Sequence, residues 1–185
     1  MELTEIPLTC ETLYDGKIIR VERMDVRLYD GRVSKREVVR HSGGCAVVAV
    51  DEDGRIPLVE QYRIAIGRTT LELPAGKVDA GEDPLVCARR ELSEETGLRA
   101  QRWQKLCDSL SSPGFTDEVL HIYLAQGLTA GAQHLDEGEY LHVKWVDLNE
   151  AVDMALAGRL ADGKTLTGLI MAQRVLAART GVRAL

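Results

Sequence analysis

Glutamates crowd one short stretch of this 185-residue sequence: Glu91, Glu94 and Glu95. On an α-helix, residues three and four positions apart are neighbours, and like charges at that spacing destabilise the helix by a few tenths of a kcal/mol per pair. A divalent cation bound among these side chains would relieve the repulsion, since Mg²⁺ prefers carboxylate oxygens and water as ligands. These residue types and their spacing therefore indicate the binding of a divalent metal ion.

The residues around the glutamates predict a helix with marked ends. Asp83 can cap its N-terminus, Pro84 suits the first helical position, and Gly97 suits the position just beyond its C-terminus. Apolar residues at helical spacing form one stripe, and at about 100° per residue the acidic side chains fall along or near its border. We therefore expect the acids at the rim of the core.

The whole stretch from Gly76 to Leu98 reads GKVDAGEDPLVCARRELSEETGL. It resembles the Nudix box at every defined position: Gly, five residues, Glu, seven residues, then the Arg-Glu run that ends in Gly-Leu. The resemblance implies an enzyme that hydrolyses nucleoside diphosphates linked to another moiety, with Mg²⁺ or Mn²⁺ held on a loop–helix–loop. The alternative is a solvated, charge-laced helix of the kind most acidic helices are.

The resemblance assigns roles within the box. It makes Glu91 and Glu95 metal ligands, places Glu94 beside them as a ligand and catalytic candidate, and adds the backbone carbonyl of Ala75. Arg90 would orient the glutamates and is also a catalytic candidate. Two to three divalent ions, Mg²⁺ or Mn²⁺ in its place, would neutralise the phosphates and acidify a bound water.

An acidic loop, residues 136–139, offers further carboxylates before the last predicted strand. In similar enzymes a glutamate at this place binds metal or activates water. We assign Glu139 to the metal and Glu137 as the candidate general base. A loop whose charges simply stay hydrated is an equally good interpretation, because loops collect charge.

Segments flanking the box narrow the substrate. EQYR at 60–63, ELPAGK at 72–77 and SPGFTDE at 112–118 look like the ADP-ribose pyrophosphatase branch, whose mark is a proline sixteen residues past the box glycine, here Pro113. That resemblance implies hydrolysis of ADP-ribose to AMP and ribose 5-phosphate. One alternative is the same chemistry on another nucleoside diphosphate sugar, such as GDP-mannose. Another is a regulator that binds ADP-ribose-like ligands without turnover, which would be expected to lack box glutamates.

The same resemblance suggests substrate-binding residues near the box. Arg63 would clamp the diphosphate, a role that suits a planar bidentate donor, and Glu72 is a further candidate. Glu118 would bind the terminal ribose hydroxyls. The turn that contains Ser112 and Gly114 would offer backbone groups to the same sugar.

Residues 9–40 predict a small antiparallel β unit, because two Tyr-Asp-Gly turn signals separate runs rich in Val, Ile and alternating charge. Such a meander has little core and exposed edges, so it should pack on another surface. The resemblance implies a homodimer that exchanges these strands, with Arg36 and Glu37 as candidates for contacting the adenine. An equal alternative to adenine contact is that these charged side chains only keep an exposed edge strand from pairing with another chain.

The remaining sequence mixes strands and helices without regular alternation, which predicts an α+β fold with a mixed sheet sandwiched by helices. This is the Nudix-type α/β/α sandwich that the resemblance implies, here over residues 43–185, after an N-terminal β unit at 1–42. Strands are expected at 45–50, 56–62, 69–73, 103–110, 119–125 and 141–146, and helices near 148–157 and 165–179.

Composition excludes several classes of protein. The formal charge of −6 argues against a protein that coats nucleic acid, where basic surface supplies most of the affinity. No stretch approaches the roughly 18 apolar residues of a membrane span, and the acidic N-terminus does not resemble a signal peptide. The four cysteines are spread singly, which favours reduced core thiols and a cytoplasmic protein without membrane partners. We expect Trp103, Phe115 and Trp145 in the core.

Overall fold

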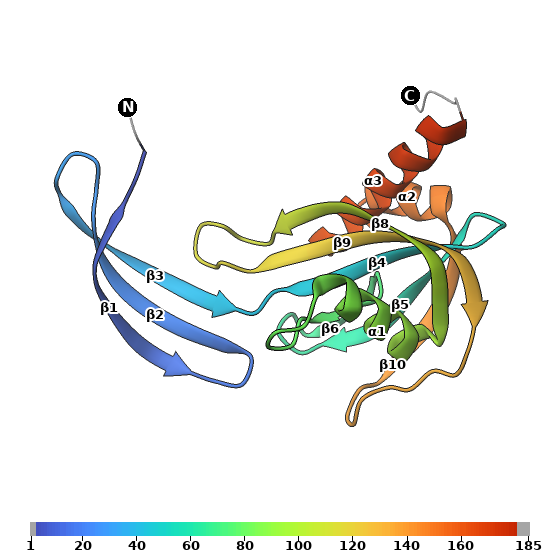
Figure 1. The fold of residues 1–185 in the computed structure, drawn as a ribbon, viewed down its shortest axis with the longest axis horizontal. Helices are drawn as coiled ribbons and strands as arrows, with labels where there is room; N and C mark the ends of the chain where they lie inside the picture. The colour runs from blue at the N-terminus through green and yellow to red at the C-terminus, as the bar shows by residue number, and fades with distance from the viewer. Residues whose placement is uncertain (1–2, 181–185) are drawn as a thin grey trace. The chain divides into compact units, whose positions relative to one another are not determined.

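The computed structural model describes residues 3–180, and the chain divides into two compact units. The first consists of Met1–Gly43 together with Leu110–Val119, and the second of Gly44–Ser109 together with Leu120–Leu185. The strands and helices, apart from β7 (Ala75–Lys77), are labelled in Figure 1. Of the helices in the described residues, none is long and apolar enough to span a membrane.

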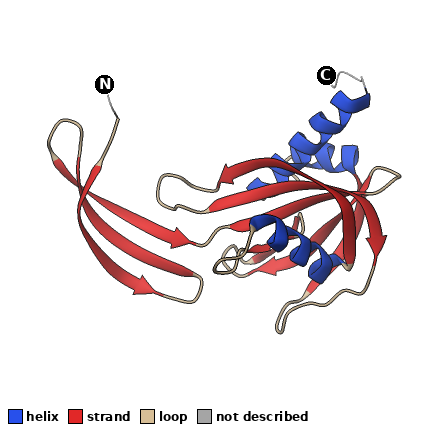
Figure 2. Ribbon diagram, viewed as in Figure 1, coloured by secondary structure: helices blue, strands red, loops and turns tan. Residues whose placement is uncertain are grey.

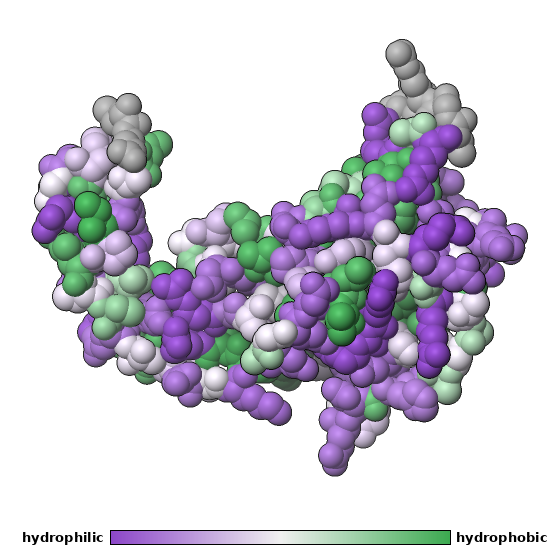
Figure 3. Space-filling view, in the orientation of Figure 1, coloured by the Kyte–Doolittle hydropathy of each residue, from purple (hydrophilic) through white to green (hydrophobic). Residues whose placement is uncertain are grey.

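The first unit contains an antiparallel sheet in the order β1-β2-β3, which confirms the predicted N-terminal β unit (Figure 2). Its edge strand β1 is exposed along its whole length, and apolar side chains lie among polar ones on the visible surface of this unit (Figure 3). Ile6 and Leu13 of β1 are among those exposed apolar residues. The strands are β1 (Ile6–Asp15), β2 (Ile19–Arg27) and β3 (Val33–His41).

The segment 110–119 belongs to this first unit because it hydrogen-bonds to β3. The backbone N–H of Val39 donates to the carbonyl of Phe115 at 2.7 Å, and the N–H of Asp117 donates to the carbonyl of Val39 at 3.3 Å. A parallel bridge joins Val39 and Thr116. The first unit therefore includes a segment from later in the sequence, beyond the strands near its N-terminus.

The second unit contains two sheets. One is a mixed sheet in the order β7-β4-β9-β8, in which β4 pairs parallel with β9 and antiparallel with β7. The other is antiparallel, in the order β10-β5-β6. The strands are β4 (Gly44–Val50), β5 (Arg55–Arg63), β6 (Arg68–Glu72), β7 (Ala75–Lys77), β8 (Leu98–Leu110), β9 (Val119–Ala130) and β10 (Leu141–Asp147).

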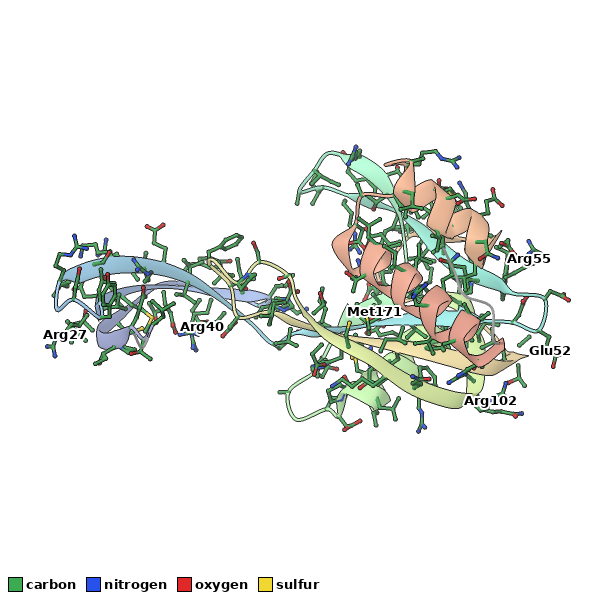
Figure 4. All side chains as sticks on the ribbon, turned by 90° about the horizontal axis from the view of Figure 1, so that it is seen from above. Arg27, Arg40, Glu52, Arg55, Arg102 and Met171 are labelled. Atoms are coloured by element: carbon green, nitrogen blue, oxygen red, sulfur yellow. The ribbon has the colours of Figure 1, made fainter. Side chains whose placement is uncertain are left out.

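Helices cover both faces of the mixed sheet, because side chains of β4 alternate between two cores. Val47 and its odd-numbered neighbours pack with α1, whereas Val48 and its even-numbered neighbours pack with α2 and α3. Figure 4 shows α2 and α3 side by side, and Gln173 of α3 donates to Asn149 of α2 at 2.8 Å. The α/β/α sandwich is thereby confirmed. The helices are α1 (Pro84–Thr96), α2 (Leu148–Leu156) and α3 (Gly163–Thr180).

Some details differ from the prediction. Strand β7 was not predicted, because three residues after a proline carry too short a pattern. Trp103 packs against the core beneath α1, but Phe115 and Trp145 are 54% and 37% exposed, so the prediction that both are core residues is wrong. Cys10 is likewise exposed rather than a core thiol.

Candidate active site

Helix α1 has the predicted caps. The Asp83 carboxylate accepts from the backbone N–H groups of Leu85 and Val86 at 2.9 and 3.3 Å, which satisfies donors that the helix leaves unpaired. Gly97 follows the helix with φ of 71° and donates its N–H to the carbonyl of Ser93 at 2.9 Å. An added Cβ at Gly97 would lie 2.9 Å from the carbonyl oxygen of Gly131, so a side chain there would collide with the loop after β9.

That loop is fastened to the end of α1. The Gln133 side chain donates to the carbonyl of Glu95 at 2.6 Å, and the N–H of His134 donates to the carbonyl of Glu94 at 3.0 Å. Both carbonyls lie in the last turn of the helix, where no partner within the helix is available. The acidic loop 136–139 is thereby tethered close to the box glutamates.

Two of the three predicted metal ligands on α1, Glu91 and Glu95, are buried. Glu91 is 9% exposed and Glu95 is 1% exposed. Burial raises the pKa of Glu91 to about 7, with the charges of Glu94 and Glu139 adding to the effect and Arg90 opposing it. Burial raises the pKa of Glu95 to about 8, although its carboxylate accepts from the N–H of Ala75 at 2.8 Å. The positive charge near these two carboxyls is therefore too small to offset their burial and keep their pKa values in the ordinary range.

Arg90 connects the beginning of the box to its glutamates. Its Nη1 donates to Glu91 at 2.6 Å and to Glu94 at 3.0 Å, while Nε and Nη2 donate to Glu82, each at 3.0 Å. Nη2 also donates to the carbonyl of Lys77 at 3.1 Å. Arg90 therefore contacts three box glutamates, and its orienting role stays a prediction.

The backbone at Gly76 lies directly against a box carboxylate. An added Cβ there would stand 2.1 Å from Cδ and Oε1 of Glu91, so a side chain would force the carboxylate away. A cluster of carboxylates held against a bare backbone suits a divalent cation, which takes oxygen ligands. In the described residues no three acidic, histidine or cysteine side chains converge on a single point as a ligand set, because Glu91 and Glu94 are turned towards Arg90.

Glu137 and Glu139 are both exposed on the loop before β10. The charge of Glu139 contributes to the raised pKa of both Glu91 and Glu95, so its carboxylate lies near that buried pair. Its Oε2 accepts from the N–H of Asp136 at 3.4 Å. The assignments of Glu139 to the metal and of Glu137 as base stay predictions.

Arg63 and Glu72, both predicted to bind substrate, are paired with each other. Nε and Nη2 of Arg63 donate to the two carboxylate oxygens of Glu72 at 2.9 and 2.7 Å. Burial alone would raise the pKa of Glu72, but hydrogen bonds from Arg63, Lys164 and Thr70 and the charge of Lys164 lower it to about 2. A cavity of about 460 Å³ borders the pair and is lined also by Ile66.

Three residues at the start of α3 were not among the predicted site residues. Lys164 donates to Glu72 at 2.5 Å, and the Thr165 hydroxyl accepts from the N–H of Leu73 at 2.9 Å. Asp162 accepts from the Thr165 N–H at 3.0 Å and thus caps the helix. The Asp-x-x-Thr pattern could have signalled a helix start. The hydrogen bond between Thr165 and Leu73, 92 residues earlier, could not be predicted from local sequence.

The remaining predicted substrate residues lie in the first unit. Arg36, Glu37 and Gly114 line one cavity of about 550 Å³ there. Arg36 forms two hydrogen bonds with Glu5 at 2.9 and 2.5 Å, which occupies its guanidinium. Their roles stay predictions.

Ser112 and Glu118 lie in the segment that joins β3. The carbonyl of Ser112 accepts from the N–H groups of Phe115 and Thr116, each at 3.1 Å, so it closes the predicted turn. The Glu118 carboxylate lies 3.4 Å from Nδ1 of His41. The turn is therefore formed, and its part in sugar binding stays a prediction.

Comparison with known proteins places these features in a family. A model of the NUDIX domain matches residues 40–168. The chain is 41% identical over 165 residues to an ADP-ribose pyrophosphatase of Bacillus subtilis, covering 88% of this chain and 89% of that protein. It is 40% identical over 164 residues to a methanol dehydrogenase activator of Bacillus methanolicus, with the same coverage. A crystal structure described as an ADP compounds hydrolase has a TM-score of 0.85 at 24% identity, covering 98% of this chain and all of that one.

Proposed function

The chain belongs to the NUDIX family, and from this premise we propose that it hydrolyses the diphosphate of ADP-ribose to AMP and ribose 5-phosphate. The observation that carries the chemistry is the burial of Glu91 and Glu95 side by side with raised pKa values. Carboxylates in that state favour a cation, and perturbed acids in one place are typical of functional sites. The choice of ADP-ribose is supported by the relative from Bacillus subtilis.

Glu91, Glu94, Glu95 and Glu139, with the carbonyl of Ala75, would hold two to three divalent ions. Bound Mg²⁺, or Mn²⁺ in its place, would neutralise the diphosphate and acidify a water molecule for attack on phosphorus. Arg90 would keep Glu91 and Glu94 in place between turnovers, because it already donates to both. Glu137 would accept the proton of the attacking water.

Substrate would be held by groups of both signs. The hydrogen bonds of Arg63 to Glu72 use Nε and Nη2 and leave Nη1 out, and a guanidinium suits a diphosphate oxygen. Glu118 would accept from ribose hydroxyls, and the turn at Ser112 and Gly114 would offer backbone groups to the same sugar. Arg36 and Glu37 would contact the adenine.

We also propose a cytoplasmic homodimer that exchanges N-terminal strands. The exposure of every residue of β1, including apolar ones such as Ile6 and Leu13, supports a surface that another chain covers. The cysteines are all free thiols, which fits a reducing compartment. Light scattering of the purified chain would test the dimer, and a monomer at micromolar concentration would contradict it.

Product analysis tests the enzymatic proposal. Purified protein with Mg²⁺ is given ADP-ribose or GDP-mannose, and release of AMP or GMP is followed by chromatography. We expect AMP release to have the larger kcat/KM. A large preference for GDP-mannose would replace the substrate, and the absence of Mg²⁺-dependent release from either would favour a ligand-binding regulator.

A further inference from the structure

We propose that the start of α3, through Asp162, Lys164 and Thr165, positions Arg63 and the loop that carries Ala75, so that this helix is part of the substrate-binding machinery. The inference rests on the proposed function, since it concerns how the diphosphate is gripped. None of the three residues is assigned a contact with substrate or metal. They act through Glu72 and Leu73.

Lys164 completes a set of charges around the buried carboxylate of Glu72, in which Arg63 stays partly exposed. Its Nζ lies 2.5 Å from Oε2 of Glu72 and 3.0 Å from Oδ2 of Asp162, and its side chain is 11% exposed. Arg63 donates to the same Glu72 oxygen at 2.7 Å. The set therefore contains two cations and two carboxylates, and lysine is almost never buried unless it is paired.

Loss of Lys164 would change what Arg63 can offer. The remaining set of Arg63, Glu72 and Asp162 would carry one negative charge beside the expected position of an anionic diphosphate. Glu72 would then hold Arg63 without competition from a second cation. Both effects would weaken the binding of an anion. They would be felt strongly, because salt and water screen charges only weakly in a partly buried site.

Thr165 secures the connection between β6 and β7. It is fully buried, and its Oγ1 accepts from the N–H of Leu73 at 2.9 Å and donates to Asp162 at 2.6 Å. The next residues of the connection are held as well: the carbonyl of Pro74 accepts from Val47 at 2.9 Å, and the N–H of Ala75 donates to Glu95 at 2.8 Å. Thr165 is thus the first of three successive anchors leading to the box.

A simple helix cap would not need this arrangement. Asp162 alone satisfies the N–H of Thr165, and a cap requires neither a buried lysine on Glu72 nor a bond to the backbone of Leu73. These extra contacts reach Glu72, which holds Arg63 of β5, and Leu73, which lies two residues before Ala75. Because both contacts lead to residues of the proposed site, they favour a role for the start of α3 in positioning that site.

A double-mutant cycle tests the path through Arg63. We measure the Kd of ADP-ribose by calorimetry without divalent metal, so that no turnover occurs, for wild type, Lys164→Met, Arg63→Ala and the double variant. We expect Lys164→Met to weaken binding about 10-fold in wild type but less than about 2-fold in the Arg63→Ala background, because coupled residues are non-additive. Equal losses in both backgrounds would overturn the proposal.

Matched variants separate positioning from folding. Lys105→Met removes a lysine from an exposed ion pair with Asp108 and should leave the Kd unchanged. Lys164→Arg keeps the charge and should retain at least half of the binding affinity, which also covers the case in which Lys164→Met does not fold. If Lys164→Arg folds and binds as weakly as Arg63→Ala, the path through charge is wrong.

Thr165 is tested by rescue. Thr165→Val removes only the hydroxyl and should lower kcat about 10-fold with a smaller change in KM, whereas Thr165→Ser should restore kcat. Equal kcat for Val and Ser would overturn the role of the hydroxyl. Wild type that binds ADP-ribose without hydrolysing it would sink the proposed function while leaving the binding cycle decisive, and wild type that does not bind it would overturn both.

Discussion

Glu72 and Glu95 are 3% and 1% exposed, yet their carboxylates are stabilised in opposite ways. Although burial opposes it, donors from Arg63, Lys164 and Thr70 lower the pKa of Glu72 to about 2. Burial raises the pKa of Glu95 to about 8, because a single backbone N–H from Ala75 does not offset that burial and the neighbouring negative charges. Burial by itself therefore does not decide whether a carboxyl is charged; the cations and donors around it do.

The difference separates a cluster whose charges are paired from one whose carboxyls lack enough cationic partners. Around Glu72 every charge has an opposite partner, so the cluster joins β5, β6 and α3. Around Glu95 and Glu91, burial and neighbouring acids make ionisation unfavourable, an arrangement that is common where a protein binds a ligand. Four experiments test whether Glu72 and Glu95 differ in this way.

The largest effect is expected on turnover. Glu95→Gln or Glu91→Gln should lower kcat by about 1,000-fold or more, equivalent to about 4 kcal/mol, because an amide is a poor ligand for a divalent ion. Steady-state release of AMP at saturating Mg²⁺ measures it. Glu52→Gln, in the exposed turn between β4 and β5 (Figure 4), is the matched control and should keep wild-type kcat. Wild-type turnover in either box variant would make the metal assignment wrong.

Removing the charge of Glu72 should mainly affect folding. Glu72→Gln leaves Arg63 and Lys164 without their shared carboxylate, which should lower the free energy of unfolding by about 3 kcal/mol. Urea unfolding measures it. Glu60→Gln, which breaks the more exposed pair with Lys144, should cost less than about 1 kcal/mol. Equal losses from the two substitutions would contradict the comparison.

Acid should remove the contribution of Glu72. Its folded pKa of about 2 lies below the ordinary value of 4.5 for a glutamate, so its contribution is complete above pH 4.5 and is lost as the pH falls towards 2. The shift corresponds to at most about 3 kcal/mol. Unfolding measured from pH 5 to pH 2.5 should therefore cost wild type more stability than Glu72→Gln. Parallel losses in the two proteins would show that Glu72 is not the group that titrates.

Mg²⁺ should have the smallest effect. At 100 times its Kd, the ion should stabilise wild type by about 2.7 kcal/mol, because it binds the folded state. Glu95→Gln should gain less, yet without metal it should be at least as stable as wild type, because folding no longer has to shift the pKa of a buried carboxyl to about 8. Thermal unfolding with and without MgCl₂ gives both values. A metal-free variant that melts well below wild type would contradict the strain we assign to Glu95.

Local patterns identified α1, its caps and the placement of its acids at the rim of the core. The N-cap at Asp83 and the C-cap at Gly97 depend on residues only a few positions away. The same is true of which side of the helix each residue lies on. Local sequence therefore predicts all three. The Nudix box is contained within one such segment. The chemistry was therefore predictable before any long-range contact was known.

Long-range contacts required the tertiary structure. Lys164 and Thr165 reach a strand 92 residues earlier, and residues 110–119 join β3 through Val39. No local pattern encodes which distant carboxylate a lysine will meet, because that depends on how helices and strands pack. From local pattern alone, an acidic helix that would bind metal could be predicted. Only the packing of α3 against β6 brought Lys164 to Glu72 and so keeps that buried carboxylate ionised, whereas burial of Glu95 without such a partner raises its pKa to about 8.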